Sequence, residues 1–203
     1  MHKLLNTKFL KQTPVEHVAQ KLLGHHLVTN IDGIKTVGKI VELEAYCGRR
    51  DKACHAYFKR TARNEVMFAE GGVAYVYLCY GIHSLFNIVT GALDEPAGVL
   101  IRGIEPIIGE KHMLKRRGMS TNTPNLSNGP GKISQALGIT TELNGELIGG
   151  PSIWLEKGGP VNDEEVLVGK RIGIDYAGED KNLPWRFAIQ SPYVGHKKGL
   201  WHR

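Results

Sequence analysis

An alternating segment at residues 40–46 limits what this chain can fold into more than any other feature. Its sequence, Ile-Val-Glu-Leu-Glu-Ala-Tyr, has the two-residue period of a β-strand. One face of that strand would carry Ile40, Glu42, Glu44 and Tyr46, and the other face would carry only apolar side chains. Because an unpaired buried carboxylate is costly, two glutamates on one face indicate either a solvent-exposed surface or a functional site. The segment alone leaves both interpretations open.

A hairpin is predicted between residues 75 and 89. Residues 75–79 are rich in β-forming side chains, a turn is expected at Tyr80 and Gly81, and residues 84–89 form the returning strand. The hairpin would carry Tyr80 at its tip. There the ring is either an ordinary aromatic at a strand end or a wedge that inserts into a partner.

Length and charge restrict the class of protein. A chain of 203 residues can bury one sizeable core, so we expect a single domain over residues 1–203. Lysine and arginine exceed aspartate and glutamate by 26 to 20, and the net charge of +6 fits an anionic partner, although solubility alone also explains such an excess. The chain has no apolar run long enough to span a bilayer and no long apolar secretory segment, so we expect a cytoplasmic protein without membrane contact.

The three cysteines predict neither a disulfide scaffold nor a metal site. Cys47, Cys54 and Cys79 cannot all pair with one another, and none forms a Cys-x-x-Cys motif. A metal site from Cys47, Cys54 and His55 would match no structural zinc spacing. We therefore expect reduced thiols and no metal.

The remaining elements predict an α+β fold with an antiparallel sheet, because short strands and a few helices follow one another without regular β-α alternation. Thr13 begins a capping box with Pro14 at the first helical position, and this helix ends at Gly24. Further helices are expected at residues 110–117 and from the segment 128–132 to Gly138, and further strands at residues 27–29, 99–101, 153–155, 166–168, 171–174 and 186–189. Arg102, at the end of the apolar strand 99–101, requires an anion, either an internal carboxylate such as Glu105 or a phosphate.

Two basic segments are candidates for phosphate binding. The segment from Lys59 to Arg63 has the composition of a phosphate-contacting loop, although a solvated charged loop is an equally simple interpretation. The sequence Asn-Gly-Pro-Gly-Lys at residues 128–132 begins a helix, where free amide groups and Lys132 favour an anion. It lacks the spacing of a Walker motif, so nucleotide triphosphate chemistry is not expected.

Several separated motifs occur in a characteristic order. They are Glu-Leu-Glu-Ala-Tyr at 42–46, His55, Arg-Asn at 63–64, Met-Phe at 67–68, Tyr-Val-Tyr-Leu-Cys-Tyr-Gly at 75–81, Asn-Ile at 87–88, Val-Leu-Ile-Arg-Gly-Ile-Glu-Pro at 99–106, Asn-Gly-Pro-Gly-Lys at 128–132 and Arg-Phe at 186–187. In this order they resemble the alkyladenine DNA glycosylase family, also called methylpurine or 3-methyladenine DNA glycosylases of the mammalian type. The resemblance covers almost the whole chain. It implies a single α+β domain with a curved antiparallel sheet, surrounding helices and a protruding hairpin.

The resemblance also implies roles for individual residues. Glu44 corresponds to the general base that activates water, and we assign Glu42 a supporting or structural part. Tyr46 and Tyr77 correspond to the aromatic walls between which the base stacks. The remaining correspondences are His55 for the residue that closes the base pocket, Asn87 for the side chain that excludes normal guanine, Tyr80 for the DNA-intercalating residue, and Arg102, Arg63 and Lys132 for contacts to the DNA backbone. The segment 56–59 departs from the glycine-rich form of mammalian members, which bears on lesion preference.

The implied activity is base-excision repair of duplex DNA. Such an enzyme flips alkylated or deaminated purines (3-methyladenine, 7-methylguanine, hypoxanthine, ethenoadenine) out of the helix and hydrolyses the N-glycosidic bond, leaving an abasic site. The resemblance implies a monofunctional enzyme that works as a monomer without metal or organic cofactor, in the cytoplasm or, in a bacterium, with the nucleoid. Two alternatives remain: a damaged-DNA binding module without turnover, and a hydrolase of free nucleosides.

Overall fold

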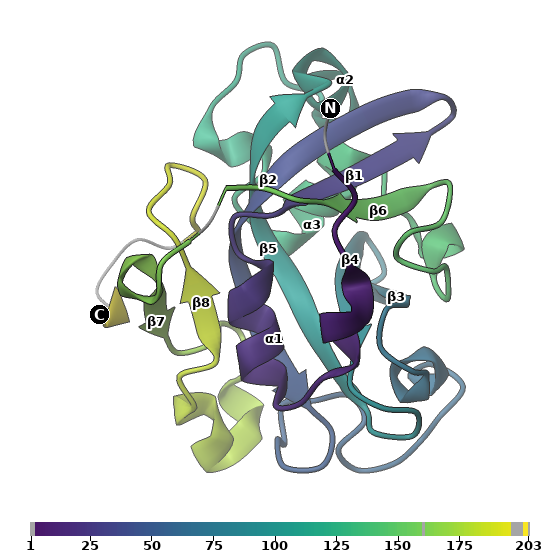
Figure 1. Ribbon diagram of the computed structural model, residues 1–203, viewed down its shortest axis with the longest axis vertical. Coiled ribbons are helices and arrows are strands. Elements are labelled where there is room, and N and C mark those ends of the chain that lie inside the picture. The colour runs from purple at the N-terminus through teal and green to yellow at the C-terminus, as the bar shows by residue number, and fades with distance from the viewer. Residues whose placement is uncertain (1–2, 160, 196–200, 203) are drawn as a thin grey trace.

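One antiparallel sheet forms the centre of the molecule in the computed structural model, which describes residues 3–159, 161–195 and 201–202 (Figure 1). Within these residues the sheet has nine strands, and all of their pairings are antiparallel. The strands are β1 (His26–Ile31), β2 (Ile34–Cys47), β3 (Ala74–Cys79), β4 (His83–Thr90), β5 (Ala97–Ile108), β6 (Ile153–Glu156), β7 (Leu167–Gly169), β8 (Arg186–Ala188) and β9 (Trp201–His202). The predicted α+β class with an antiparallel sheet is confirmed.

The helices are short and lie around this sheet. They are α1 (Val15–Leu22), α2 (Glu110–Arg117) and α3 (Pro130–Leu137), with 3₁₀ turns η1 (Thr7–Lys11), η2 (Glu65–Phe68), η3 (Pro124–Leu126), η4 (Thr141–Leu143), η5 (Asp163–Glu165) and η6 (Asp175–Asn182). As predicted, α2 and α3 end at glycines, and Gly118 and Gly138 both adopt left-handed backbone angles there. Figure 1 shows α1 in front of the sheet and α2 at one end of the molecule.

The long strand β2 is the element that positions the site. It pairs with β5 on one side, with β8 on the other and with β1 near its start, in the strand order β3-β4-β5-β2-β8-β7-β9. Its register against β5 is irregular between Ile40 and Glu42 and again after Glu42. Such irregularities redirect side chains locally. Ile40, expected on the face of the glutamates, accordingly lies in the main hydrophobic core.

The two faces of β2 are both buried, by different parts of the chain. Leu43 and Ala45 lie in one core cluster with Val18 and Leu22 of α1. On the opposite side, residues 172 and 195 donate backbone hydrogen bonds to the glutamates, whose side chains have no exposed surface. The solvent-exposed interpretation of the glutamate face is therefore wrong.

Three local predictions also need correction. The capping box at Thr13 does not form, because Pro14 is the N-cap residue and no side chain caps the helix. Arg102 lies in the middle of β5 rather than at a strand end, since the strand continues to Ile108. Residues 171–174 form no strand; Gly173 has a φ of 74°, a left-handed value that interrupts extended structure.

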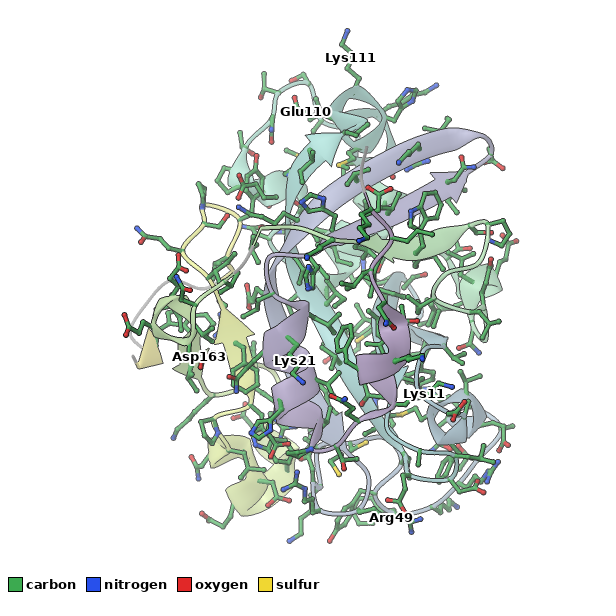
Figure 2. The ribbon with its side chains drawn as sticks, viewed as in Figure 1. Lys11, Lys21, Arg49, Glu110, Lys111 and Asp163 are labelled. Carbon is green, nitrogen blue, oxygen red and sulfur yellow. The ribbon has the colours of Figure 1, made fainter. Side chains whose placement is uncertain are left out.

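Charged side chains occupy the outer surface. Figure 2 shows Lys111 and Glu110 projecting from α2, Asp163 from η5 and Arg49 from the opposite end of the molecule. Among the described residues, no helix is both long and apolar enough to cross a membrane.

Candidate active site

Glu44 is a fully buried carboxylate with three donors. The Tyr46 hydroxyl donates to Oε2 over 2.7 Å, Nη1 of Arg102 donates to the same oxygen over 3.3 Å, and the Ile172 amide donates to Oε1 over 2.8 Å. These donors give both carboxylate oxygens a hydrogen-bond partner, and a buried carboxylate without such partners would be costly. Burial, followed by the negative charge of Glu44, raises the pKa of Tyr46 well above its ordinary value. The phenol therefore stays protonated and holds the carboxylate in place.

Glu42 shares Arg102 with Glu44. Its Oε1 accepts from Nε of Arg102 at 3.1 Å and from Nε of Arg186 at 2.9 Å, and its Oε2 accepts from the Gly195 amide. The anions required by Arg102 are thus Glu42 and Glu44. Glu105 is not its partner, because that carboxylate pairs with Lys39 at 3.1 Å. The two glutamates form one buried network around a common arginine.

A cavity of about 490 Å³ opens beside this network. That volume lies within the range of small-molecule sites, roughly 300–1,000 Å³. It is lined by seven of the nine site residues expected from the sequence: Tyr46, His55, Arg63, Tyr77, Tyr80, Asn87 and Arg102. Glu44 does not line it, but its two side-chain donors Tyr46 and Arg102 do.

Aromatic side chains make up one wall of the cavity. The His55 ring packs edge-on against Tyr77, with ring centres 4.5 Å apart, and its Nδ1 lies 3.1 Å from the Tyr75 hydroxyl. Partial burial, followed by the positive charge of Arg63, lowers the pKa of His55 below the ordinary histidine value. Buried Asn87 donates to the Tyr75 carbonyl across the hairpin. These contacts fix the histidine and the amide against one wall.

The hairpin of β3 and β4 carries Tyr80 at its tip, as predicted. The Tyr80 side chain is 92% exposed, and Leu78 and Ile82 beside it are also exposed. Both turn residues have positive φ, 51° at Tyr80 and 72° at Gly81. The tip thus presents an apolar projection at the edge of the cavity.

Of the three residues predicted to contact the DNA backbone, Arg102 is buried and donates to Glu42 and Glu44, whereas Arg63 and Lys132 lie elsewhere. Arg63 lies at the cavity, with its guanidinium 5.5 Å from the Tyr77 ring centre and a hydrogen bond to the Leu78 carbonyl. Lys132 lies outside the cavity lining, where Asn125 and Asn128 accept from its ammonium group. Within the basic loop, Arg60 pairs with Glu65 and Asp94, so its charge is already matched.

No sequence motif indicated several residues that the structure places at the site. Arg171 and Asp51 form a fully buried ion pair behind Tyr46, and Tyr176 lines the cavity while donating to the Ala53 carbonyl. Tyr75, which also lines the cavity, was predicted to lie in a strand but was given no role in the site. Arg186, which donates to Glu42, lies in the Arg-Phe motif at residues 186–187 but had no assigned role. Among the described residues, no group of three histidine, cysteine, aspartate or glutamate side chains is placed to hold a metal ion.

Comparison with known proteins gives a consistent result over most of the chain. A family model described as "Methylpurine-DNA glycosylase (MPG)" matches residues 8–192. A relative from Chlamydia abortus is 47% identical over 191 residues, covering 92% of this chain and 98% of the relative. A relative from Natranaerobius thermophilus is 44% identical over 194 residues, covering 94% and 98%. A relative from Bacillus mycoides is 46% identical over 191 residues, covering 87% and 92%. All three bear the name "Putative 3-methyladenine DNA glycosylase".

Proposed function

This chain belongs to the methylpurine-DNA glycosylase family, and from that premise we propose that it excises damaged purines from duplex DNA. The substrates are alkylated or deaminated purines, and the product is an abasic site. The observation that carries the proposal is the position of Glu44, a buried carboxylate whose donors Tyr46 and Arg102 both line an aromatic cavity next to an exposed hairpin tip.

The first step of the proposed mechanism is base flipping. Tyr80 inserts into the duplex and fills the space that the extruded nucleotide leaves, because removing a base from the stack costs a few kcal/mol that a replacement ring partly restores. The flipped purine enters the cavity and stacks between Tyr46 and Tyr77, with His55 closing the pocket. Asn87, fixed by its bond to the Tyr75 carbonyl, crowds the 2-amino group of normal guanine and so disfavours it.

Hydrolysis follows at the edge of the cavity nearest Glu44. Glu44 accepts a proton from a water molecule that attacks C1′, while its negative charge stabilises the oxocarbenium-like sugar. Arg102 and Tyr46 keep the carboxylate oriented throughout. A cationic alkylated purine leaves as a neutral base, so this single carboxylate is sufficient for that group of lesions.

The proposed enzyme is monofunctional. Strand cleavage by a glycosylase requires an amine nucleophile that forms a Schiff base with the sugar. Among the described residues that line the cavity there is no lysine, which supports hydrolysis alone. The partner is double-stranded DNA, and the protein acts as a monomer in the cytoplasm or with a bacterial nucleoid.

The decisive experiment replaces the general base. We expect Glu44→Gln to lower single-turnover release of hypoxanthine or 7-methylguanine from duplex DNA by about a hundredfold to ten-thousandfold, the usual contribution of a general acid or base. Release is scored by alkali-induced cleavage at the abasic site, and DNA binding is measured in parallel and should persist. Glu105→Gln is the matched control, because Glu105 lies on β5 and pairs with Lys39 on the surface.

The other outcomes separate the alternatives. Full excision by Glu44→Gln would move the catalytic role to another residue. Binding of damaged duplexes without release of any purine by the wild type would identify a binding module. Cleavage of free nucleosides at a rate that salt does not affect would identify a nucleoside hydrolase, since phosphate contacts make DNA binding salt-dependent.

A further inference from the structure

Arg171 lies directly behind the wall of the base cavity. Its guanidinium carbon is 4.7 Å from the centre of the Tyr46 ring, on a side chain with no exposed surface. Its Nη1 donates to the carbonyl oxygen of Ala45 over 2.9 Å. Ala45 is the residue between Glu44 and Tyr46. Arg171 therefore contacts both the ring of the cavity wall and the backbone that joins this wall to the buried carboxylate.

Asp51 holds Arg171 in this position. Both of its carboxylate oxygens accept from Arg171, one from Nη1 and the other from Nη2 at 2.7 Å, and the Asp51 side chain is also fully buried. Oδ1 of Asp51 accepts in addition from the amide of Ala53, a residue of the cavity lining. The ion pair thus joins β2 to the loop that leads to His55.

The residue after Arg171 completes the connection. The amide of Ile172 donates to Oε1 of Glu44, and Ile172 itself lines the cavity. Fixing Arg171 therefore fixes the backbone donor of the carboxylate. Three separate parts of the chain, β2, the loop after it and residues 171–174, meet at one guanidinium.

We propose that Arg171, held by Asp51, is a positioning residue that sets the geometry of Glu44 relative to the base-stacking face of Tyr46. The inference rests on the proposed glycosylase function. Two consequences follow from it: the rate of bond cleavage depends on Arg171, and so does the discrimination between damaged and normal purines, because both depend on where the Tyr46 ring stands. Arg171 does not touch the substrate.

The geometry distinguishes arginine from lysine at this position. A planar guanidinium donates to a carboxylate at two points, bonds a carbonyl and stacks on a ring at the same time. A lysine ammonium retains the charge but cannot do all of these together. Arg171→Lys is therefore a mild substitution for folding and a severe one for positioning, whereas removal of the charge would leave Asp51 buried and unpaired.

The test compares Arg171→Lys and Asp51→Asn with the wild type. We expect each variant to lower the single-turnover excision rate of hypoxanthine by about tenfold to a hundredfold, which is the order of loss for a displaced catalytic group. The ratio of hypoxanthine to adenine excision should fall as well. Affinity for a duplex containing an abasic site should remain that of the wild type, because the hairpin and the basic residues are unchanged.

Arg116→Lys is the matched control. Arg116 also donates to a backbone carbonyl and to a hydroxyl, those of Ala136 and Thr36, but it lies outside the cavity lining. If the ion pair of Arg171 is purely structural, both variants should have a lower melting temperature. The excision rate and the discrimination of the folded variants should then equal those of the wild type. That result would overturn the inference while leaving the glycosylase function intact. Absence of purine release by the wild type would overturn both.

Discussion

His55 brings a titratable group to the wall of the base cavity. Its ring is fixed between Tyr77 and the Tyr75 hydroxyl, and its pKa is lowered by partial burial and by Arg63. The imidazole is consequently neutral at neutral pH. Protonation of His55 requires a lower pH than protonation of an ordinary histidine. It would add a positive charge to a cavity that already contains Arg63 and Arg102.

This titration predicts a pH-dependent lesion preference. As pH falls below about 6.5, the ordinary histidine value, through the lowered pKa of His55, the cationic base 7-methylguanine should be repelled more than neutral hypoxanthine. The ratio of 7-methylguanine to hypoxanthine excision is then expected to fall, and His55→Gln should remove the dependence. The measurement is single-turnover excision of both lesions across the acidic range. A ratio that stays constant in the wild type would contradict the prediction.

The same shift has a consequence for stability. The folded protein binds a proton at His55 less tightly than the unfolded chain does. The contribution of His55 to the free energy of unfolding is therefore present above the ordinary histidine pKa, and it is lost as pH falls through the lowered pKa of the folded state. The rate comparison must therefore be made on protein shown to be folded at each pH.

At the scale of elements, the hairpin of β3 and β4 combines strain with exposure. A tyrosine with a φ of 51° occupies the left-handed region, which costs a residue other than glycine roughly 1–2 kcal/mol. Asparagine tolerates this region much better. The presence of an exposed aromatic ring in a strained turn position is better explained by function than by stability.

We expect the substitution Tyr80→Asn at the hairpin tip to have opposite effects on stability and on excision. Tyr80→Asn should leave the melting temperature unchanged or raise it, because the turn is relieved of strain. It should lower excision by about fivefold to a hundredfold, corresponding to a stacking contribution of about 1 to 3 kcal/mol. Tyr80→Phe is the control, since it keeps both the ring and the strain and should excise like the wild type. Wild-type excision by Tyr80→Asn would show that the ring is not needed for flipping.

The accuracy of prediction from sequence differed between elements for a physical reason. The alternation of β2 and the turn residues of the hairpin are local signals, and both elements formed where expected. The alternation predicted that the two glutamates share a face of β2. It did not decide whether this face is buried, because the residues that bury it are distant in sequence, at 171–195. Residues 171–174 alternate like a strand, yet the left-handed Gly173 and the contacts of Arg171 make them a loop.

The site residues that lie in family motifs could be predicted from the sequence. Seven of the nine site residues expected from the sequence line one cavity. Arg171 and Asp51 are 120 residues apart in sequence and lie in no recognised motif, so only folding reveals their contact. Long-range ion pairs of this kind leave no periodic or local signal in a single sequence.

For the whole molecule, the buried arginines are not the source of the positive charge. Arg102, Arg171 and Arg186 pair with three buried carboxylates, so this cluster is neutral and the excess of +6 lies elsewhere in the chain. Phosphate contacts must accordingly come from accessible cations. Lys132 is a candidate because asparagine side chains, rather than carboxylates, accept from its ammonium group, which leaves its charge uncompensated by those contacts.

The salt dependence of DNA binding tests this assignment. Each neutralised phosphate releases counterions, so the logarithm of the binding constant falls linearly with the logarithm of salt concentration, with a slope of about −0.9 per contact. Lys132→Ala should weaken binding of damaged and undamaged duplexes alike and make the slope shallower by about 1. Lys21→Ala removes the same charge from α1, which packs on Leu43 and Ala45, the face of β2 opposite Glu44. It should change the slope much less. Equal slopes for Lys132→Ala and the wild type would mean that Lys132 contacts no phosphate, and that the anion-binding interpretation of the Asn-Gly-Pro-Gly-Lys segment is wrong.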